Sequence, residues 1–225
     1  MPTVLQALKT RSSKRLYSSK LVPKKIQEEI LKAANNTPSG ANMQPWITYA
    51  VNDEKILKNI GDAIISKMEA GIEHDQFVQY YPVKWKNPYK KRRMETGIGL
   101  YKHMNVERKD TIARTKMWQD NFRWFGAKTV FFVFTDKDMI DCAQGAFIDC
   151  GAYMQSILLC AKEFDLDTCP QASTTEFGNI VAKVLNIPQN LTLLYSIVIG
   201  YAEEDSNINS YQPPRVNIKE NVIFI

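Results

Sequence analysis

Two short stretches near the start of the chain, RSSKR at residues 11–15 and PSGANMQPW at residues 38–46, are its most informative feature. The first sets two arginines around serine hydroxyls, and guanidinium groups and hydroxyls both suit phosphate oxygens. The second is bounded by prolines and carries Asn42 and Gln44, whose amides can donate and accept hydrogen bonds. A basic pentapeptide alone usually marks a solvated turn. Together, with a helix expected between them, the two stretches predict a site for a phosphorylated, planar ligand.

Composition narrows the possible classes of protein. Of the 225 residues, 44% are hydrophobic and 24% are charged, which is usual for a globular protein and argues against disorder. We therefore expect one domain over residues 1–225, with a sizeable core. No run approaches about 18 consecutive apolar residues, so no membrane span is expected. The first residues lack the apolar core of a secretory signal.

Cysteine and histidine usage argues against metal and disulfide chemistry. The four cysteines lie eight, ten and nine residues apart, no C-x-x-C pair occurs, and the two histidines are His74 and His103. We expect no zinc site, no disulfide framework and a reducing cytoplasmic location. Nucleotide-loop, nucleophile-elbow and H-E-x-x-H motifs are missing as well. The sequence therefore offers few side chains that could act as acid, base or nucleophile, which points to a bound cofactor that carries the reaction.

The net charge of +5 suits anionic ligands, whereas a nucleic-acid-binding protein would usually show a sharper basic concentration. The one basic and aromatic segment, residues 80–93, has three open interpretations. It could be a solvated loop, a lid whose aromatic rings stack on a bound substrate, or a nucleic-acid patch or nuclear address.

Hydrophobic periodicity predicts an α+β fold. Helices are expected at 3–8, 23–34, 53–68, 108–118, 145–164 and 176–185, and strands at 46–51, 129–135 and 193–200. Residues 72–104 are poorly periodic and are expected to be irregular, and such a long stretch in a compact domain is usually functional or mobile. The apolar tail at residues 222–225 has no obvious strand partner in its own chain, which is typical of pairing with another subunit.

The motifs resemble those of a known family. Arg11, Ser13 and Arg15 match R-x-S-x-R, and residues 38–46 match P-S-x-x-N-x-Q-P-W. Further likeness occurs at NFRWFG (121–126), DCGAYMQ (149–155), DTCPQ (167–171), Gly200 and Arg215. In these features the chain resembles the nitroreductase family of FMN-dependent NAD(P)H oxidoreductases. The resemblance implies a mixed β-sheet flanked by helices, a three-layer sandwich, in an intertwined homodimer with both flavin sites at the interface.

The resemblance also assigns flavin contacts by position. It places Arg11 and Arg215, helped by Ser12 or Ser13, on the FMN phosphate, and Arg15 on the ring edge that becomes anionic on reduction. A loop of Pro38, Ser39, Gly40 and Asn42 would reach the flavin from the opposite subunit. A turn of Pro170, Gln171, Ala172 and Ser173 would bring backbone amides to N5 and O4, while Thr168 and Cys169 fill packing positions. Asn121, with Arg123, is assigned more loosely to the pyrimidine edge.

The implied activity is reduction of a nitroaromatic or quinone-type acceptor by NAD(P)H, in a ping-pong reaction that passes hydride through flavin N5. FMN carries the chemistry and no catalytic side chain is expected, while residues 72–104 would form a substrate lid. The alternatives are a specialised family member, either a reductive dehalogenase or a flavin-degrading enzyme, and a non-catalytic flavin-binding carrier.

Overall fold

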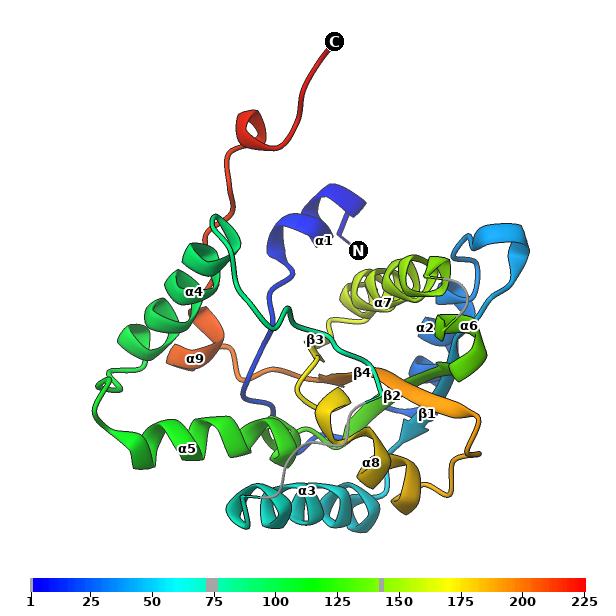
Figure 1. The fold of residues 1–225 in the computed structure, drawn as a ribbon, viewed down its shortest axis with the longest axis horizontal. Helices are drawn as coiled ribbons and strands as arrows, with labels where there is room; N and C mark the ends of the chain where they lie inside the picture. The colour runs from blue at the N-terminus through cyan, green and yellow to red at the C-terminus, as the bar shows by residue number, and fades with distance from the viewer. Residues whose placement is uncertain (1, 72–76, 142–143) are drawn as a thin grey trace.

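A computed structural model describes residues 2–71, 77–141 and 144–225, and Figure 1 shows the fold. His74, Cys142 and residues 72–76 of the expected lid lie outside the described residues. The helices are α1 (Val4–Thr10), α2 (Lys24–Ala34), α3 (Glu54–Glu69), α4 (Tyr89–His103), α5 (Thr111–Gln119), α6 (Lys137–Asp141), α7 (Gly145–Glu163), α8 (Gly178–Val184) and α9 (Asn207–Ser210). The strands are β1 (Ile47–Val51), β2 (Thr129–Asp136), β3 (Asp167–Gln171) and β4 (Leu191–Gly200). Short 3₁₀ turns lie at η1 (Gly40–Asn42), η2 (Asp120–Gly126), η3 (Thr175–Phe177) and η4 (Ile218–Glu220).

The strands form one sheet in the order β1-β2-β4-β3, and each neighbouring pair is antiparallel. A parallel component is present as a single bridge between Ser13 and Thr168 at the outer side of β3. The two central strands, β2 and β4, are buried along almost their whole length. Their continuous apolar sequences reflect this burial, because both faces of the sheet are covered.

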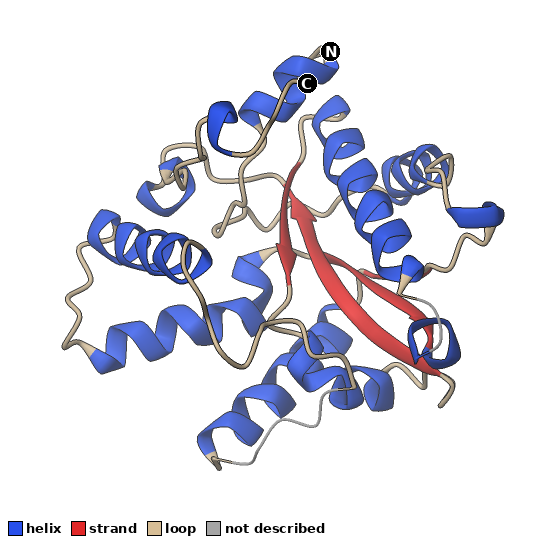
Figure 2. Ribbon diagram, turned by 45° about the horizontal axis from the view of Figure 1, so that its top comes forward, coloured by secondary structure: helices blue, strands red, loops and turns tan. Residues whose placement is uncertain are grey.

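Alternate side chains of β2 point into two separate cores. Phe132 and Phe134 pack with α3 and α8, whereas Phe131 and Val133 pack with α2 and α7. Figure 2 shows the strands lying between these groups of helices. The predicted α+β fold, with a sheet between two layers of helices, is therefore confirmed.

Local signals in the sequence fix the ends of the helices. The Thr3 hydroxyl accepts the Gln6 N–H, and Gln6 accepts the Thr3 N–H in return, so a capping box begins α1. Asp53 accepts the N–H groups of Lys55 and Ile56 and begins α3. The helices predicted at 3–8 and 53–68 are thus confirmed, and α1 ends directly before Arg11.

Glycine allows α3 to approach η2 closely. A Cβ atom on Gly61 would lie 2.1 Å from the backbone carbonyl oxygen of Phe122. The Trp124 indole N–H donates to the Leu57 carbonyl oxygen at 2.9 Å across the same contact. This contact fixes residues 120–126, which lead into β2.

Two expectations about elements were wrong or incomplete, and the pairing of the C-terminal tail with another subunit stays a prediction. Residues 89–103, expected to be irregular, form α4; none of its residues is buried, so its sequence shows no core-facing stripe. Helix α6 and strand β3 were not predicted, and β3 contains Pro170, which an edge strand tolerates. Residues 222–225 form no strand in this chain, and Phe224 is 88% exposed.

Helices long and apolar enough to span a bilayer do not occur among the described residues.

Candidate functional site

The segment of residues 11–16, here called the N-terminal segment, runs along the outer edge of β3. Arg11 is the last cap residue of α1. Ser13 then bridges to Thr168, and the Lys14 N–H donates to the Thr168 carbonyl oxygen at 3.2 Å. The helix exit and the strand edge therefore fix the backbone that carries Arg11 and Arg15.

Two guanidinium groups from opposite ends of the sequence come close together. Burial lowers the pKa of the half-buried Arg11 below its ordinary value, and the positive charge of Arg215 lowers it further. Arg215 is exposed and donates to the carbonyl oxygen of Pro213 at 2.9 Å. Within the described residues neither arginine forms an ion pair. An anion in contact with both groups would remove this repulsion.

Unpartnered hydroxyl groups occur in the N-terminal segment, in β3 and just after β3. Ser12 is 5% exposed, and the buried Oγ of Ser12, Oγ1 of Thr168 and Oγ of Ser173 have no hydrogen-bond partner among the described residues. Buried polar atoms are almost always paired, because leaving one unpaired costs about 1–3 kcal/mol. An unpaired serine hydroxyl next in sequence to one of two interacting cations fits a phosphorylated ligand.

The segment of residues 170–173, predicted to be a turn, begins within the end of β3 and contacts the predicted Asn121. The Gln171 side-chain amide donates to the backbone oxygen of Asn121 at 2.9 Å and to its Oδ1 at 3.3 Å. The Gln171 Oε1 accepts the Ser196 hydroxyl at 3.2 Å. These bonds use the side chains of Asn121 and Gln171 internally, so Pro170–Ser173 would contact a ligand mainly through backbone groups and Ser173.

The loop of residues 38–42 is held on α7. The Gly40 N–H donates to both carboxylate oxygens of Asp149, at 3.3 and 3.2 Å. The Ser39 hydroxyl accepts the Gln44 N–H at 2.9 Å. Ala41, Asn42 and Gln44 all have positive φ angles of 46–58°. Non-glycine residues adopt this conformation rarely, and it clusters at functional sites.

The structure brings the predicted residues together in two groups rather than one. The first group lies along β3 and contains Arg11, Ser12, Ser13 and Arg15, with Arg215 and residues 170–173. The second group lies against the first turns of α7 and contains Pro38, Ser39, Gly40 and Asn42. No hydrogen bond or ion pair among the described residues joins the two groups. Asp149 lies near the start of α7 and β3 follows its end, and a helix of this length is about 28 Å long.

Cys169 lies behind the N-terminal segment and is 3% exposed. Burial raises the pKa of its thiol to about 11, although Arg15, Ser13 and Arg11 act in the opposite direction. A thiol with this pKa is protonated near neutral pH and is a poor nucleophile. The expected packing role of Cys169 fits its surroundings.

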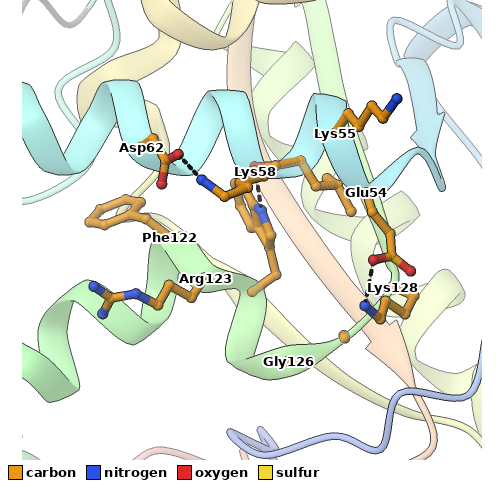
Figure 3. A pocket seen from close by; sticks show the side chains of 11 residues that line it. Glu54, Lys55, Lys58, Asp62, Phe122, Arg123, Gly126 and Lys128 are labelled. Carbon is orange, nitrogen blue, oxygen red and sulfur yellow. Dashed lines mark hydrogen bonds and ion pairs between the residues drawn. The ribbon is translucent and has the colours of Figure 1, made fainter.

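Arg123 contacts the neighbouring residues of α5 and η2. Its guanidinium lies 3.5 Å from the Asp120 carboxylate and donates to the Gln119 side chain at 3.3 Å. It lines a hollow of about 450 Å³ between α3 and η2 (Figure 3). In that hollow Lys58 pairs with Asp62, and Lys128 pairs with Glu54. The contact of Arg123 with the flavin pyrimidine edge stays a prediction.

Helix α4 borders the predicted phosphate residues. The Tyr211 hydroxyl donates to the Thr96 carbonyl oxygen at 3.0 Å, and the His103 ring lies 2.8 Å from the Ser210 hydroxyl. Between α4 and the C-terminal residues is a groove of about 450 Å³, and Lys91, Arg92 and Arg215 are among the residues that line it. The basic residues of α4 therefore lie beside Arg215.

A model of the nitroreductase family matches residues 8–201. This chain belongs to the nitroreductase family. The relationship inferred from the motifs is thus confirmed. Relatives of this nitroreductase-family chain include 4-nitrobenzoate reductase from Nocardioides sp. (strain LMS-CY), which is 31% identical over 96% of this chain and 87% of its own. Chloronitrobenzene nitroreductase from Comamonas testosteroni is 27% identical over 100% of this chain and 97% of its own.

Solved structures agree with this family assignment. The crystal structure of FMN and NADPH-dependent nitroreductase NfnB from Sphigopyxis sp. strain HMH is similar over 100% of this chain and 99% of its own. The TM-score is 0.94 and the sequence identity is 28%.

Two residues with site contacts were missed by reasoning from the sequence. The Lys14 ammonium group donates to the backbone oxygen of Asn209 at 2.9 Å. Asp149 anchors the loop of residues 38–42. The only signal was position: Lys14 lies inside RSSKR (11–15), and Asp149 is the first residue of DCGAYMQ (149–155). Among the described residues, no group of His, Cys, Asp or Glu side chains could hold a metal ion.

Proposed function

We propose that this chain is an FMN-dependent oxidoreductase that uses NAD(P)H to reduce nitroaromatic or quinone-type acceptors. The observation that carries the proposal is that Arg11 and Arg215 are near enough for their charges to interact, and that the Ser12 hydroxyl, next to Arg11 in the sequence, has no partner among the described residues. The family assignment and relatives named as nitroreductases support the same activity. Residues 1–225 are proposed to form one domain.

The chemistry that FMN supplies when bound is hydride transfer from NAD(P)H to an acceptor through its N5 atom. Arg11 and Arg215 would hold the phosphate with charge-assisted hydrogen bonds, and Ser12 and Ser13 would add hydroxyl donors. The guanidinium of Arg15 donates to the Ser13 carbonyl oxygen at 3.3 Å, which holds its charge beside β3. A cation there would stabilise negative charge that develops on the reduced ring.

A second copy of the chain is proposed to complete each site. The loop of residues 38–42 is anchored on Asp149 near the start of α7, and its backbone has positive φ angles at Ala41 and Asn42. Large apolar side chains are exposed on α1, on α7 and in the C-terminal tail, including Leu5, Ile148 and Phe224. Exposed apolar groups of this kind are typical of subunit interfaces. An intertwined homodimer would bury them and bring the loop to the partner's flavin.

Helix α4 and the loop before it are proposed as the substrate lid. Arg93 stacks on Trp85 at 4.7 Å, and Tyr81 packs against the same indole. These contacts form an aromatic and basic surface next to the groove that contains Arg215. Such a surface suits planar acceptors and the phosphates of a nicotinamide dinucleotide.

Free thiols at Cys150, Cys160 and Cys169 support the proposed cytoplasmic location.

The test is the absorption spectrum of the purified protein with added FMN, before and after NADH or NADPH under anaerobic conditions. We expect a bound flavin whose absorbance is bleached by NADH or by NADPH. The absorbance should return when 4-nitrobenzoate or a quinone is added. Parallel lines in double-reciprocal plots would support the ping-pong order. Protein that does not bind FMN refutes the proposal, and bound flavin that neither nucleotide bleaches indicates a carrier. Bleaching that only a halogenated aromatic reverses, with release of halide, indicates a dehalogenase.

A further inference from the structure

Asn209 is a buried amide at the start of the C-terminal arm, defined here as residues 207–217. It is 1% exposed. Its Oδ1 accepts the N–H groups of Arg15 at 2.7 Å and Leu16 at 3.1 Å. Its Nδ2 donates to the carbonyl oxygens of Leu16 at 2.7 Å and Glu203 at 2.8 Å. Both donors and both acceptor positions of the amide are therefore used.

The backbone of Asn209 is held in the same place. Its carbonyl oxygen accepts the Lys14 ammonium group at 2.9 Å, and its N–H donates to the Ser206 carbonyl oxygen at 3.0 Å. One residue thus joins the N-terminal segment, which carries Arg11 and Arg15, to the arm that carries Arg215. The two segments lie nearly two hundred positions apart in the sequence, and Asn209 makes four hydrogen bonds between them.

Joining these segments has a physical consequence. Arg11 and Arg215 carry like charges and repel each other when no anion lies between them, so the arm must be held in place by other contacts. The Arg215 side chain makes hydrogen bonds to Pro213 and Pro214, both in its own arm. Asn209 is the residue of the arm whose hydrogen bonds tie it to the N-terminal segment, six positions before Arg215.

We propose that Asn209 is a positioning residue that locks the C-terminal arm onto the N-terminal segment, so that Arg11 and Arg215 meet the flavin phosphate together. This inference rests on the proposed function, because it assumes that the two guanidinium groups bind the phosphate of FMN. Preorganised groups bind more tightly, since less motion is lost on binding. The contribution of Asn209 should therefore appear in recognition of the phosphate rather than of the ring.

The experiment compares FMN with riboflavin, which lacks the phosphate. Dissociation constants for both are measured by quenching of flavin fluorescence, with the wild-type protein, Asn209→Ala, Asn209→Asp and Asn207→Ala. Asn207 is the matched control, because it lies two residues away in α9 and its side chain is exposed. The readout is the ratio of the riboflavin constant to the FMN constant, with thermal unfolding measured alongside.

We expect Asn209→Ala to lower this ratio by at least about tenfold, while Asn207→Ala leaves it unchanged. Asn209→Asp keeps the two bonds that the Oδ1 accepts and loses the two that Nδ2 donates, so the ratio should fall by about threefold or more. If Asn209→Ala does not fold, the ratio of Asn209→Asp decides the question.

A variant that weakens FMN and riboflavin equally, or neither, overturns the inference and leaves Asn209 a purely structural role. That result is distinct from failure of the proposed function, in which the wild-type protein would bind no FMN.

Discussion

Replacing Arg215 by methionine should weaken FMN binding without destabilising the protein that lacks FMN. The guanidinium is exposed, and in the described residues its hydrogen bonds go to Pro213 and Pro214, in its own arm. Exposed side chains with such local contacts change stability by about 0.5 kcal/mol or less. The substitution also removes the positive charge that lowers the pKa of Arg11. Stability without ligand should therefore stay the same or rise slightly.

The expected loss in FMN affinity follows from the contacts assigned to the phosphate. A hydrogen bond to a charged group contributes about 1.5–3 kcal/mol. Since each 1.4 kcal/mol is a factor of about ten, the dissociation constant for FMN should rise roughly 10- to 150-fold. Riboflavin has no phosphate, so its affinity should change little. Arg11→Met should show the same selectivity for the phosphate.

Isothermal titration with FMN and riboflavin measures these affinities, and calorimetric unfolding measures stability. Arg123→Met is the control, because Arg123 is also exposed and its guanidinium lies toward Gln119 and Asp120. An unchanged FMN constant in Arg215→Met would refute the assignment. Equal weakening of FMN and riboflavin would also contradict it, because the effect would then not involve the phosphate.

Three further substitutions or truncations test the fold, a buried thiol and the interface. Gly61→Ala should lower the free energy of unfolding by about 1–3 kcal/mol or more, because the new Cβ would lie 2.1 Å from the Phe122 carbonyl oxygen; an unchanged unfolding midpoint would contradict the close approach of α3 and η2. The Cys169 thiol has its ordinary pKa of 9.0 when unfolded and about 11 when folded, so the folded state keeps its proton between these values. Stability from this group is complete below pH 9 and is lost as the pH rises toward 11, by about 1 kcal/mol between pH 8 and 10. In urea titrations Cys169→Ala should lose less stability over this interval, and an equal loss in both proteins would argue against the raised pKa. Removal of residues 222–225 should shift the protein toward monomer in sedimentation equilibrium, and an unchanged mass distribution would speak against a role of the tail in the dimer.

The sequence predicts the elements with clear hydrophobic patterns. Strands β2 and β4 are continuous apolar runs, and α7 has apolar residues at helical spacing, so burial determines all three. Helix α4 was missed because no residue in it is buried. Its strong helix-forming residues and the contacts of Tyr211 and His103 hold it instead. Periodicity mainly reports a buried face, so it gave little signal over α4.

The site was predicted in part for a similar reason. The R-x-S-x-R motif and Arg215 could be selected because arginine and serine suit phosphate, and the structure places them together. Asn209 gave no signal, since it lies in a polar run and bonds to residues far away in the sequence. The left-handed backbone at Ala41 was equally hidden, because alanine rarely adopts it.

The most direct test of the central claim is a crystal structure of the protein with FMN bound. We expect the phosphate within hydrogen-bond distance of both Arg11 and Arg215, and the loop of residues 38–42 from a second copy against the flavin ring. A phosphate bound elsewhere, with both guanidinium groups in solvent, would contradict the account.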